Sequence, residues 1–225
     1  MCTIIAADSK KGLCHVECCL LEKKIIQEED SKMSAKLHAP DEQIKDPQVA
    51  LNFLKEGNER FVSGNTIPRN TNAEDIKITA TGQKPFAAIL TCADSRVAPE
   101  LYFDQKIGDI FIVRNAGNYA DMEALGSIEF ATKHLGAPLV VVVGHSMCGA
   151  VFTSHDKVTG LSDNLQAVLD NIRVNIESCG TKEEAVTANV KAQVETLKNN
   201  PVIKEVGALV VGAEYDIASG KVSFH

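Results

Sequence analysis

The chain has 225 residues, of which 44% are hydrophobic and 24% are charged, and its formal net charge is −7 at pH 7. The length suits one α/β domain with a well-buried core, and the composition is ordinary for a soluble globular protein. The acidic balance, with a pI near 5.4, argues against a basic surface for binding nucleic acid or anionic membranes.

The seven cysteines are an odd number without regular spacing, which favours a reducing, cytoplasmic compartment over a disulfide scaffold. Four of them lie within the first nineteen residues, where an exposed arm is favoured over a lipidation or redox site. No apolar stretch has the length of a membrane span. The N-terminus has no basic region ahead of an apolar core, so we expect no secretory signal.

Residues 1–45 carry mixed charge without a sustained period, and we expect an N-terminal arm that is partly helical or mobile. Residues 46–225 are expected to form the α/β domain. Its first helix has a clear beginning, because Asp46 is a good N-cap and Pro47 suits the first helical position. Gly64 predicts the end of this helix.

After an expected polar loop, apolar runs alternate with segments of helical periodicity along the rest of the chain. This alternation predicts a mostly parallel central sheet with right-handed crossovers, flanked by helices. We expect four parallel strands and an antiparallel edge strand. The loop is expected at 65–82, the strands at 86–92, 110–114, 139–143, 206–212 and 221–224, and the helices at 98–103, 121–135, 161–177 and 182–198.

The stretch from Val140 to Ala150 carries the clearest chemical pattern. Four consecutive valines end at Gly144, which is typical of a strand buried on both faces of a parallel sheet. His145 and Cys148 follow at once, so they are expected at the carboxyl end of a central strand, where open α/β sheets bind ligands. Imidazole and thiolate are also good zinc ligands.

A second apolar run ends in Cys92, Asp94 and Arg96. If the chain stays extended there, the three side chains point to one face. Together with His145 and Cys148, Cys92 completes three possible ligands, and three protein ligands leave the open fourth position that is typical of catalytic zinc. Asp94 and Arg96 are expected to form a charge-assisted pair beside it.

Taken singly, each of these residues has an ordinary structural explanation. A lone cysteine is usually a small buried apolar residue, a lone histidine is usually structural, and a lone ion pair contributes little energy. Their joint occurrence at neighbouring strand ends favours a metal site over these separate explanations.

The residues also resemble a known family, the β-class carbonic anhydrases. The likeness rests on C-A-D-S-R at Cys92–Arg96, followed by G-H-S-M-C-G at Gly144–Gly149. It extends to G-Q-K-P-F before the first strand, to F-I-V-R-N-A-G-N at Phe111–Asn118 and to G-S-I-E-F-A-T-K-H-L-G at Gly126–Gly136. The similarity is good over residues 47–150, weaker beyond them, and absent in the arm.

The resemblance implies one Zn²⁺ per subunit, held by Cys92, His145 and Cys148. It implies a carbonate dehydratase that reversibly hydrates carbon dioxide to bicarbonate and a proton through a zinc-bound hydroxide. It also implies an obligate homodimer, possibly a tetramer, with each pocket built across the subunit interface. Neither the resemblance nor the residues decide between dimer and tetramer.

The resemblance further implies roles for individual side chains. Asp94, restrained by Arg96, would orient the hydroxide as the catalytic pair, in an open form of the site. Many relatives carry Tyr where this chain has Phe130, which leaves any polar role at that position in doubt. The substrate pocket implied by the resemblance consists of Gln83, Phe111, Ala116, Phe130, Val97 and Gly149.

Two other functions are open on the sequence alone. Enzymes that hydrolyse carbon disulfide or carbonyl sulfide resemble this family and keep the same zinc ligands, and access to the pocket would distinguish them. A zinc protein that binds bicarbonate without turnover is the second alternative. The Asp94–Arg96 pair argues against it, because a pure binder has no hydroxide to orient.

Overall fold

The structure is a computed structural model, and it describes residues 43–67 and 73–225. The chain divides into two compact units, Met1–Ala39 and Pro40–His225, and all described residues belong to the second unit. The expected N-terminal arm therefore lies, except for its last three residues, outside the described part of the chain, as do the four cysteines in it.

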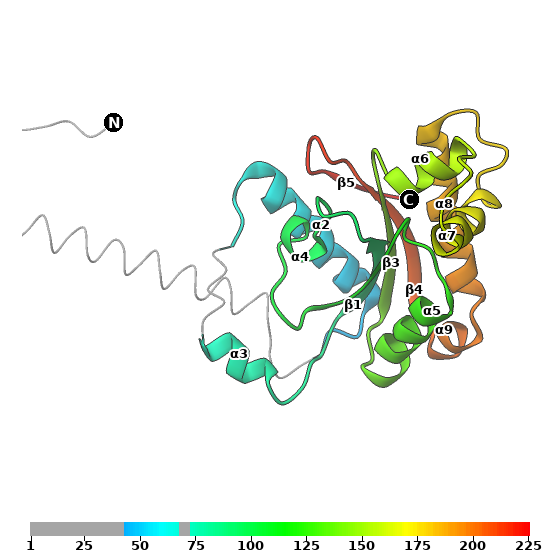
Figure 1. The fold of residues 1–225 in the computed structure, drawn as a ribbon. Coiled ribbons are helices and arrows are strands. Elements are labelled where there is room, and N and C mark those ends of the chain that lie inside the picture. Colours follow the sequence, from blue (N-terminus) through cyan, green and yellow to red (C-terminus); the bar gives the residue numbers. More distant parts are fainter. Residues whose placement is uncertain (1–42, 68–72) are drawn as a thin grey trace, which may run out of the picture. The chain divides into compact units, whose positions relative to one another are not determined.

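A five-stranded sheet forms the centre of the second unit (Figure 1), in the order β2-β1-β3-β4-β5. The first four strands are parallel and β5 is antiparallel to β4. This arrangement confirms the expected α/β fold with four parallel strands and an antiparallel edge. The strands are β1 (Ala87–Cys92), β2 (Ile110–Asn115), β3 (Leu139–His145), β4 (Leu209–Tyr215) and β5 (Val222–Phe224).

Helices cover both faces of the sheet, with α2 and α4 on one face and α5 to α9 on the other (Figure 1). The strands β1 and β3 are buried at every residue because helices pack on both of their faces. The helices are α2 (Pro47–Ser63), α3 (Ala73–Thr79), α4 (Pro99–Tyr102), α5 (Met122–Glu129), the π-helix η1 (Phe130–His134), α6 (Gly149–His155), α7 (Asp163–Arg173), α8 (Lys182–Asn199) and α9 (Pro201–Val206).

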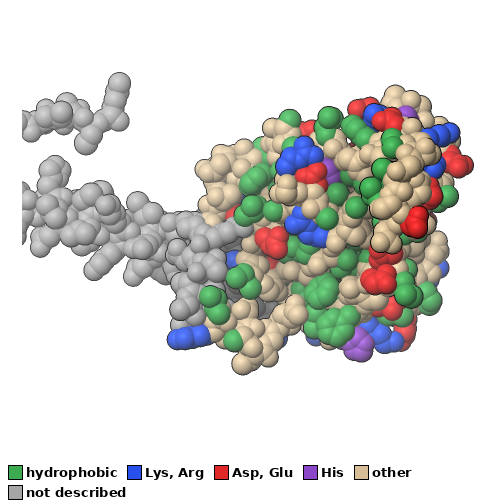
Figure 2. Space-filling model, in the orientation of Figure 1, with side chains coloured by type: hydrophobic (Ala, Val, Ile, Leu, Met, Phe, Trp, Pro, Cys, Tyr) green, Lys and Arg blue, Asp and Glu red, His purple; other side chains and the backbone are tan. Residues whose placement is uncertain are grey.

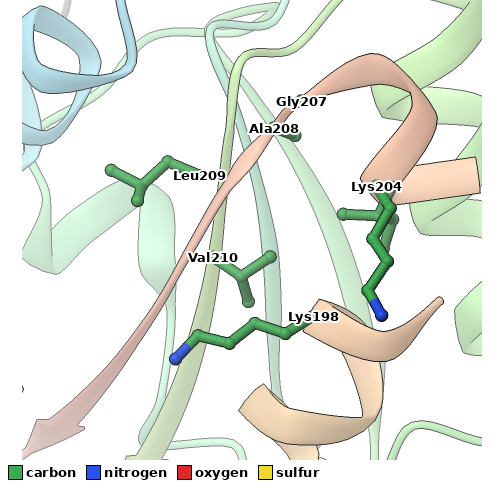
Figure 3. A pocket seen from close by; sticks show the side chains of 7 residues that line it. Lys198, Lys204, Gly207, Ala208, Leu209 and Val210 are labelled. Carbon is green, nitrogen blue, oxygen red and sulfur yellow. The ribbon is translucent and has the colours of Figure 1, made fainter. Parts of the chain in front are cut away.

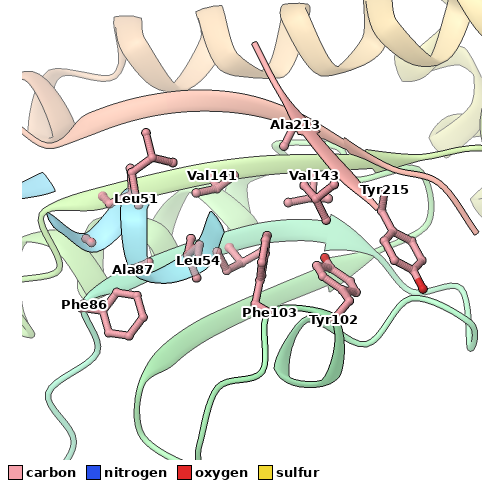
Figure 4. Close-up of a cluster of buried hydrophobic side chains, with 14 of the residues drawn as sticks. Leu51, Leu54, Phe86, Ala87, Tyr102, Phe103, Val141, Val143, Ala213 and Tyr215 are labelled. Atoms are coloured by element: carbon pink, nitrogen blue, oxygen red, sulfur yellow. The ribbon is translucent and has the colours of Figure 1, made fainter. Parts of the chain in front are cut away.

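The helix α2 begins and ends at the predicted residues. The Asp46 side chain accepts a hydrogen bond from the Gln48 amide, and Gly64 ends the helix with a φ of 73°. Leu51 and Leu54 point from α2 toward the sheet, where they pack in the cluster of buried side chains drawn in Figure 4. This packing places α2 on the face opposite α8.

The helix α8 lies close to β3 and β4 because glycines stand where it crosses them. A Cβ atom on Gly144 would lie 2.5 Å from Val190 Cγ2, and one on Gly212 would lie 3.0 Å from Val190 Cγ1. The first distance is too short for a real contact and the second is shorter than most, so glycine at both positions permits this approach. The helix itself begins with a capping box between Thr181 and Glu184.

Two expectations about the elements were wrong. The segment expected as a polar loop contains α3, whose Ile76 and Ile78 are exposed and gave no amphipathic signal. The fourth strand begins at Leu209 instead of 206, because 201–206 forms α9. The side chain of Asn200 caps α9 by accepting from two amides, and Gly207 ends it at a φ of 70°.

The remaining differences concern element boundaries. The helix expected over 121–135 ends at Glu129 and continues as the π-helix η1, and the third strand runs two residues further, to His145. Across residues 43–67 and 73–225, every helix is too short or too polar to cross a bilayer. Acidic and basic side chains are interspersed with hydrophobic ones on the face in Figure 2.

Candidate metal centre

The carboxyl ends of β1 and β3 bring the candidate ligands together. Cys92 is the last residue of β1 and His145 the last of β3, and the two strands are parallel neighbours with Thr91 opposite Val143. A turn follows His145, in which Met147 has a φ of 59°. That turn returns the chain to the same sheet edge and places Cys148 at the N-cap of α6.

The potential ligand atoms of Cys92, His145 and Cys148 all lie within 4.8 Å of one another, and all three residues are buried. The two sulfur atoms are 4.0 Å apart. Two sulfurs bound to one tetrahedral zinc, each at about 2.3 Å, are about 3.8 Å apart, so the observed spacing suits a shared ion.

The His145 ring is oriented for metal binding. Its Nδ1 lies 2.9 Å from the carbonyl oxygen of Ser146, which selects the tautomer that carries the proton on Nδ1. Its Nε2 is buried and has no hydrogen-bond partner among the described residues. A buried nitrogen lone pair without a partner, facing two sulfur atoms, is well explained by a metal ligand.

The electrostatics of the sulfur pair favour one thiolate even before a metal binds. Hydrogen bonding from Cys148 lowers the pKa of Cys92 to about 4, although burial of the sulfur opposes this shift. The amide of Gly117 donates to the same sulfur at 3.5 Å and acts in the same direction. The pKa of Cys148 is raised, because its thiol donates to the Cys92 sulfur and is itself buried.

Asp94 and Arg96 form a two-point ion pair beside the ligands. Arg96 Nη2 donates to Asp94 Oδ2 at 2.6 Å and Nε donates to Oδ1 at 2.9 Å, and the Arg96 main-chain amide also donates to Oδ1. The guanidinium holds the pKa of the Asp94 carboxyl well below its usual range. Asp94 is therefore ionised at neutral pH and can only accept hydrogen bonds.

The condition under which the three side chains would share a face, an extended chain after Cys92, is not met. The strand ends at Cys92, and a turn follows in which the Val97 amide donates to the Asp94 carbonyl. The turn, and not strand alternation, brings Arg96 back onto Asp94.

Arg114 is a site residue to which the sequence analysis assigned no role. Its Nε donates to the carbonyl of Cys92 at 3.0 Å, and its Nη2 donates to the carbonyl of Asp94 at 2.7 Å. The side chain thus holds the segment that carries one ligand and the acidic residue. Hydrogen bonds to main-chain carbonyls cannot be inferred from a sequence pattern. Within the sequence, only the position of Arg114 in the segment Phe111–Asn118 pointed to the site.

The six expected pocket residues divide into two groups within one chain. Ala116 and Gly149 are exposed at the ligand end of the sheet, where their chain neighbours Gly117 and Ala150 approach each other. Val97 is also at that end but fully buried in the cluster beneath α2.

Gln83, Phe111 and Phe130 form the second group. Phe111 pairs with Ala88, four residues before Cys92, so it lies about 13 Å along the strands from the ligand end. Phe130 contacts Phe111 with ring centroids 6.4 Å apart, and Gln83 is exposed ahead of β1. The fold therefore does not bring these three residues close to the candidate metal ligands of their own chain.

A cavity of about 270 Å³ lies elsewhere, where Lys198 of α8 and Lys204 of α9 border the start of β4 (Figure 3). Its lining includes Leu209 and Val210 at the amino end of β4. The ligand cluster is at the carboxyl ends of the neighbouring strands, so this cavity is separate from it.

The fold and the cluster together define an α/β protein with a buried Cys-His-Cys group, spaced as metal ligands are, at the carboxyl edge of a parallel sheet. The family model described as carbonic anhydrase matches residues 87–222, more than half of the chain. The chain belongs to the β-class carbonic anhydrase family.

Two curated relatives illustrate the range of similarity. Carbonic anhydrase 2 of Mycobacterium tuberculosis is 52% identical over 105 residues, which are 47% of this chain and 51% of the relative, so the match spans about half of that protein. Carbonic anhydrase of Mycolicibacterium smegmatis is 33% identical over 189 residues, covering 78% of this chain and 92% of the relative.

A solved structure supports the fold. It is described as one of two tetrameric β-carbonic anhydrases from the filamentous ascomycete Sordaria macrospora. The identity is 26%, the TM-score is 0.61, and the match covers 77% of this chain and 95% of that one.

Proposed function

We propose that the chain binds one Zn²⁺ through Cys92, His145 and Cys148, and that it catalyses the reversible conversion of carbon dioxide and water into bicarbonate and a proton. The observation that carries the proposal is the buried, unpartnered Nε2 of His145 beside two sulfur atoms 4.0 Å apart. Membership of the carbonic anhydrase family supplies the reaction.

Zinc held there would act as a Lewis acid that lowers the pKa of a water molecule, so that a nucleophile forms near neutral pH. The protein's own contribution lies with Asp94 and Arg96. Because Asp94 is ionised, it accepts a hydrogen bond from the attacking water and directs the remaining oxygen lone pair at carbon dioxide. Arg96 fixes the carboxylate in that position through two hydrogen bonds.

We also propose that the active form is a homodimer, formed through the edge strand β2. That strand is at the edge of the sheet, yet Phe111 and Val113 are only half-buried and Phe130 beside them is 48% exposed. A hydrophobic edge strand left open is prone to pair with another chain. Tetrameric relatives are known in the family, which supports oligomerisation without deciding the number of subunits.

A dimer of this kind would complete the substrate pocket. A two-fold axis pairs two β2 strands antiparallel, so the Phe111 end of one copy faces the Asn115 end of the other. Phe111 and Phe130, which lie far from the cysteines of their own chain, would then line the pocket of the second copy. Ala116 and Gly149 would contribute from the chain that holds the metal.

We place the protein in a reducing compartment such as the cytoplasm. The sulfur atoms of Cys92 and Cys148 are 4.0 Å apart and are not joined by a disulfide bond. Two thiols this close can form a disulfide bond under oxidising conditions, and neither sulfur would then be available as a thiolate ligand. Fractionation of cells followed by thiol labelling of the isolated protein would test this placement.

The decisive experiment measures zinc content and stopped-flow carbon dioxide hydration on the same purified sample. We expect one zinc per chain and hydration activity that chelation removes and added zinc restores. Cys92→Ser should lose both, whereas Cys179→Ser, which changes a half-buried cysteine outside the cluster, should keep both. Absence of zinc from native protein, or hydrolysis of carbonyl sulfide or carbon disulfide without carbon dioxide hydration, would overturn the proposal.

A further inference from the structure

A chain of buried side-chain amides runs from α8 to the candidate metal centre. Asn189 and Gln193 are one helical turn apart on α8, and they are 0% and 1% exposed. Gln193 Nε2 donates to Asn189 Oδ1 at 3.1 Å, and Asn189 Nδ2 donates to the carbonyl of Gly117 at 2.9 Å. Burying two amides in a helix face that otherwise packs on the sheet has a cost that only such bonds offset.

The order of donors and acceptors in this chain is fixed from one end. The amide of Ala120 donates to Gln193 Oε1 at 3.1 Å, so the nitrogen of Gln193 must face Asn189. The oxygen of Asn189 then faces Gln193, and its nitrogen faces Gly117. Gln193 therefore determines which end of the Asn189 amide reaches the turn after β2.

That turn bears directly on a metal ligand. The amide of Gly117 donates to the sulfur of Cys92 at 3.5 Å. Gly117 has a φ of 78°, and a Cβ atom there would lie 2.4 Å from Ile172, so both the conformation and the space require glycine. The next residue, Asn118, is also left-handed, with a φ of 46°. Two consecutive left-handed residues belong to no helix or strand, and the side chains of Asn115 and Asn189 both bond main-chain groups of this turn.

We propose that Asn189 and Gln193 are positioning residues for the metal centre. By holding the carbonyl of Gly117, they aim its amide at the Cys92 sulfur and so set where that sulfur lies and how strongly it donates to the metal. The proposal rests on the zinc site proposed above. Removing a group that hydrogen-bonds a metal ligand commonly weakens metal binding by about 10- to 100-fold.

The test substitutes the donor and reads the metal directly. Asn189→Leu keeps the approximate size of the side chain and removes the amide. We expect zinc binding, measured by competition with a chelator, to weaken by about 10- to 100-fold. In protein loaded with cobalt, the thiolate-to-cobalt absorption should move to longer wavelength, because a sulfur that has lost a hydrogen bond is a better electron donor.

Asn58→Leu is the matched control. Asn58 is also a buried amide that bonds main-chain groups, those of Tyr102, Gly220 and Val222, but it contacts none of the ligands. It should lower stability without altering zinc affinity or the cobalt spectrum. Gln193→Leu, which leaves Asn189 in place, should shift both readouts in the same direction and by less.

A measurement on the unaltered protein keeps the test independent of folding defects. With cadmium-113 bound, the amide proton of Gly117 should show a scalar coupling to the metal through the sulfur. Absence of that coupling would overturn the proposal, as would folded Asn189→Leu and Gln193→Leu variants with unchanged zinc affinity and cobalt spectrum. Failure of the unaltered protein to bind zinc would instead refute the proposed function.

Discussion

At the scale of single residues, the position of the Asp94 carboxylate depends on the hydrogen-bond donors of two arginines. Arg96 supplies three donors, two from its guanidinium and one from its main chain, while Arg114 holds the carbonyl of the same aspartate. The side chain of Arg96 is half exposed, so the pair contributes little to stability. Its effect is expected in the orientation of the carboxylate.

We predict that Arg96→Ala lowers the rate of carbon dioxide hydration by about 10- to 100-fold and leaves one zinc per chain. Without the guanidinium, Asp94 is free to rotate away from the attacking water or toward the metal. Arg96→Lys is the control, since it keeps the charge and loses the two-point contact, and it should recover part of the rate. Stopped-flow hydration with metal analysis measures both, and an unchanged rate in Arg96→Ala would contradict the role assigned to the pair.

A second residue-scale prediction concerns pH and stability. Burial raises the pKa of the Tyr102 hydroxyl well above its usual value, and this hydroxyl has no hydrogen-bond partner among the described residues. Because the folded pKa lies above the unfolded one, this group favours the folded state fully below about pH 10 and loses that contribution as pH rises further.

Tyr102→Phe should therefore resist alkaline unfolding better than the unaltered protein, with no loss of stability at pH 7. Denaturant unfolding at pH 7 and at pH 10 to 11 measures the difference. Equal alkaline unfolding of the Tyr102 variant and the unaltered protein would contradict the prediction.

At the scale of elements, caps were more informative than periodicity. The beginnings of α2 and α8 were predictable because Asp46 and Thr181 are good N-caps. The runs of β1 and β3 were predictable because strands buried on both faces are continuously apolar. By contrast, α9 has six residues, too few for a period, and its last residue, Val206, was taken as the start of the next strand.

The contact between α8 and β3 gives the element-scale prediction. Gly144→Ala places a methyl group 2.5 Å from Val190 Cγ2, so we expect a loss of about 1–3 kcal/mol in the free energy of unfolding. Adding Val190→Ala should make the pair of changes less destabilising than the sum of the two single changes.

Gly126→Ala is the matched control for that experiment. Gly126 lies in α5, and a Cβ atom there would meet nothing within 4 Å. It should raise the free energy of unfolding by about 0.5–1 kcal/mol, because alanine is the better helix former. Equal effects of the two glycine changes on the free energy of unfolding would contradict the idea that the close approach of α8 requires glycine at position 144.

At the scale of the whole molecule, the meeting of the candidate ligands could be predicted from sequence because they stand at the ends of two strands. Parallel neighbouring strands end at the same edge, so Cys92 and His145 had to meet there. The substrate pocket was less predictable, because its expected residues lie at both ends of the sheet. No single sequence motif indicates the order of the strands, on which their positions depend. The residues on α8 that contact the turn after β2 gave no signal beyond their helical spacing.

The proposed assembly gives the molecule-scale prediction. Phe111→Glu introduces a charge on the half-buried edge strand β2, so we expect a monomer that retains zinc but loses carbon dioxide hydration. Light scattering after size exclusion, metal analysis and stopped flow measure the three properties. Val174→Glu, at a residue 69% exposed after α7, should leave all three unchanged. A fully active monomer would contradict the shared pocket.

The positions of β1 and β3 in the centre of the sheet have a consequence for local opening. Amide protons in these two strands should exchange with solvent only when the entire domain unfolds, whereas those of residues 94–96, which are more exposed, should exchange through small fluctuations. Two of the three proposed metal ligands thus belong to the last part of the molecule to open. Asp94 and Arg96, the pair proposed to orient the attacking water, lie in a part that opens early, so on heating we expect hydration activity to be lost before zinc is released.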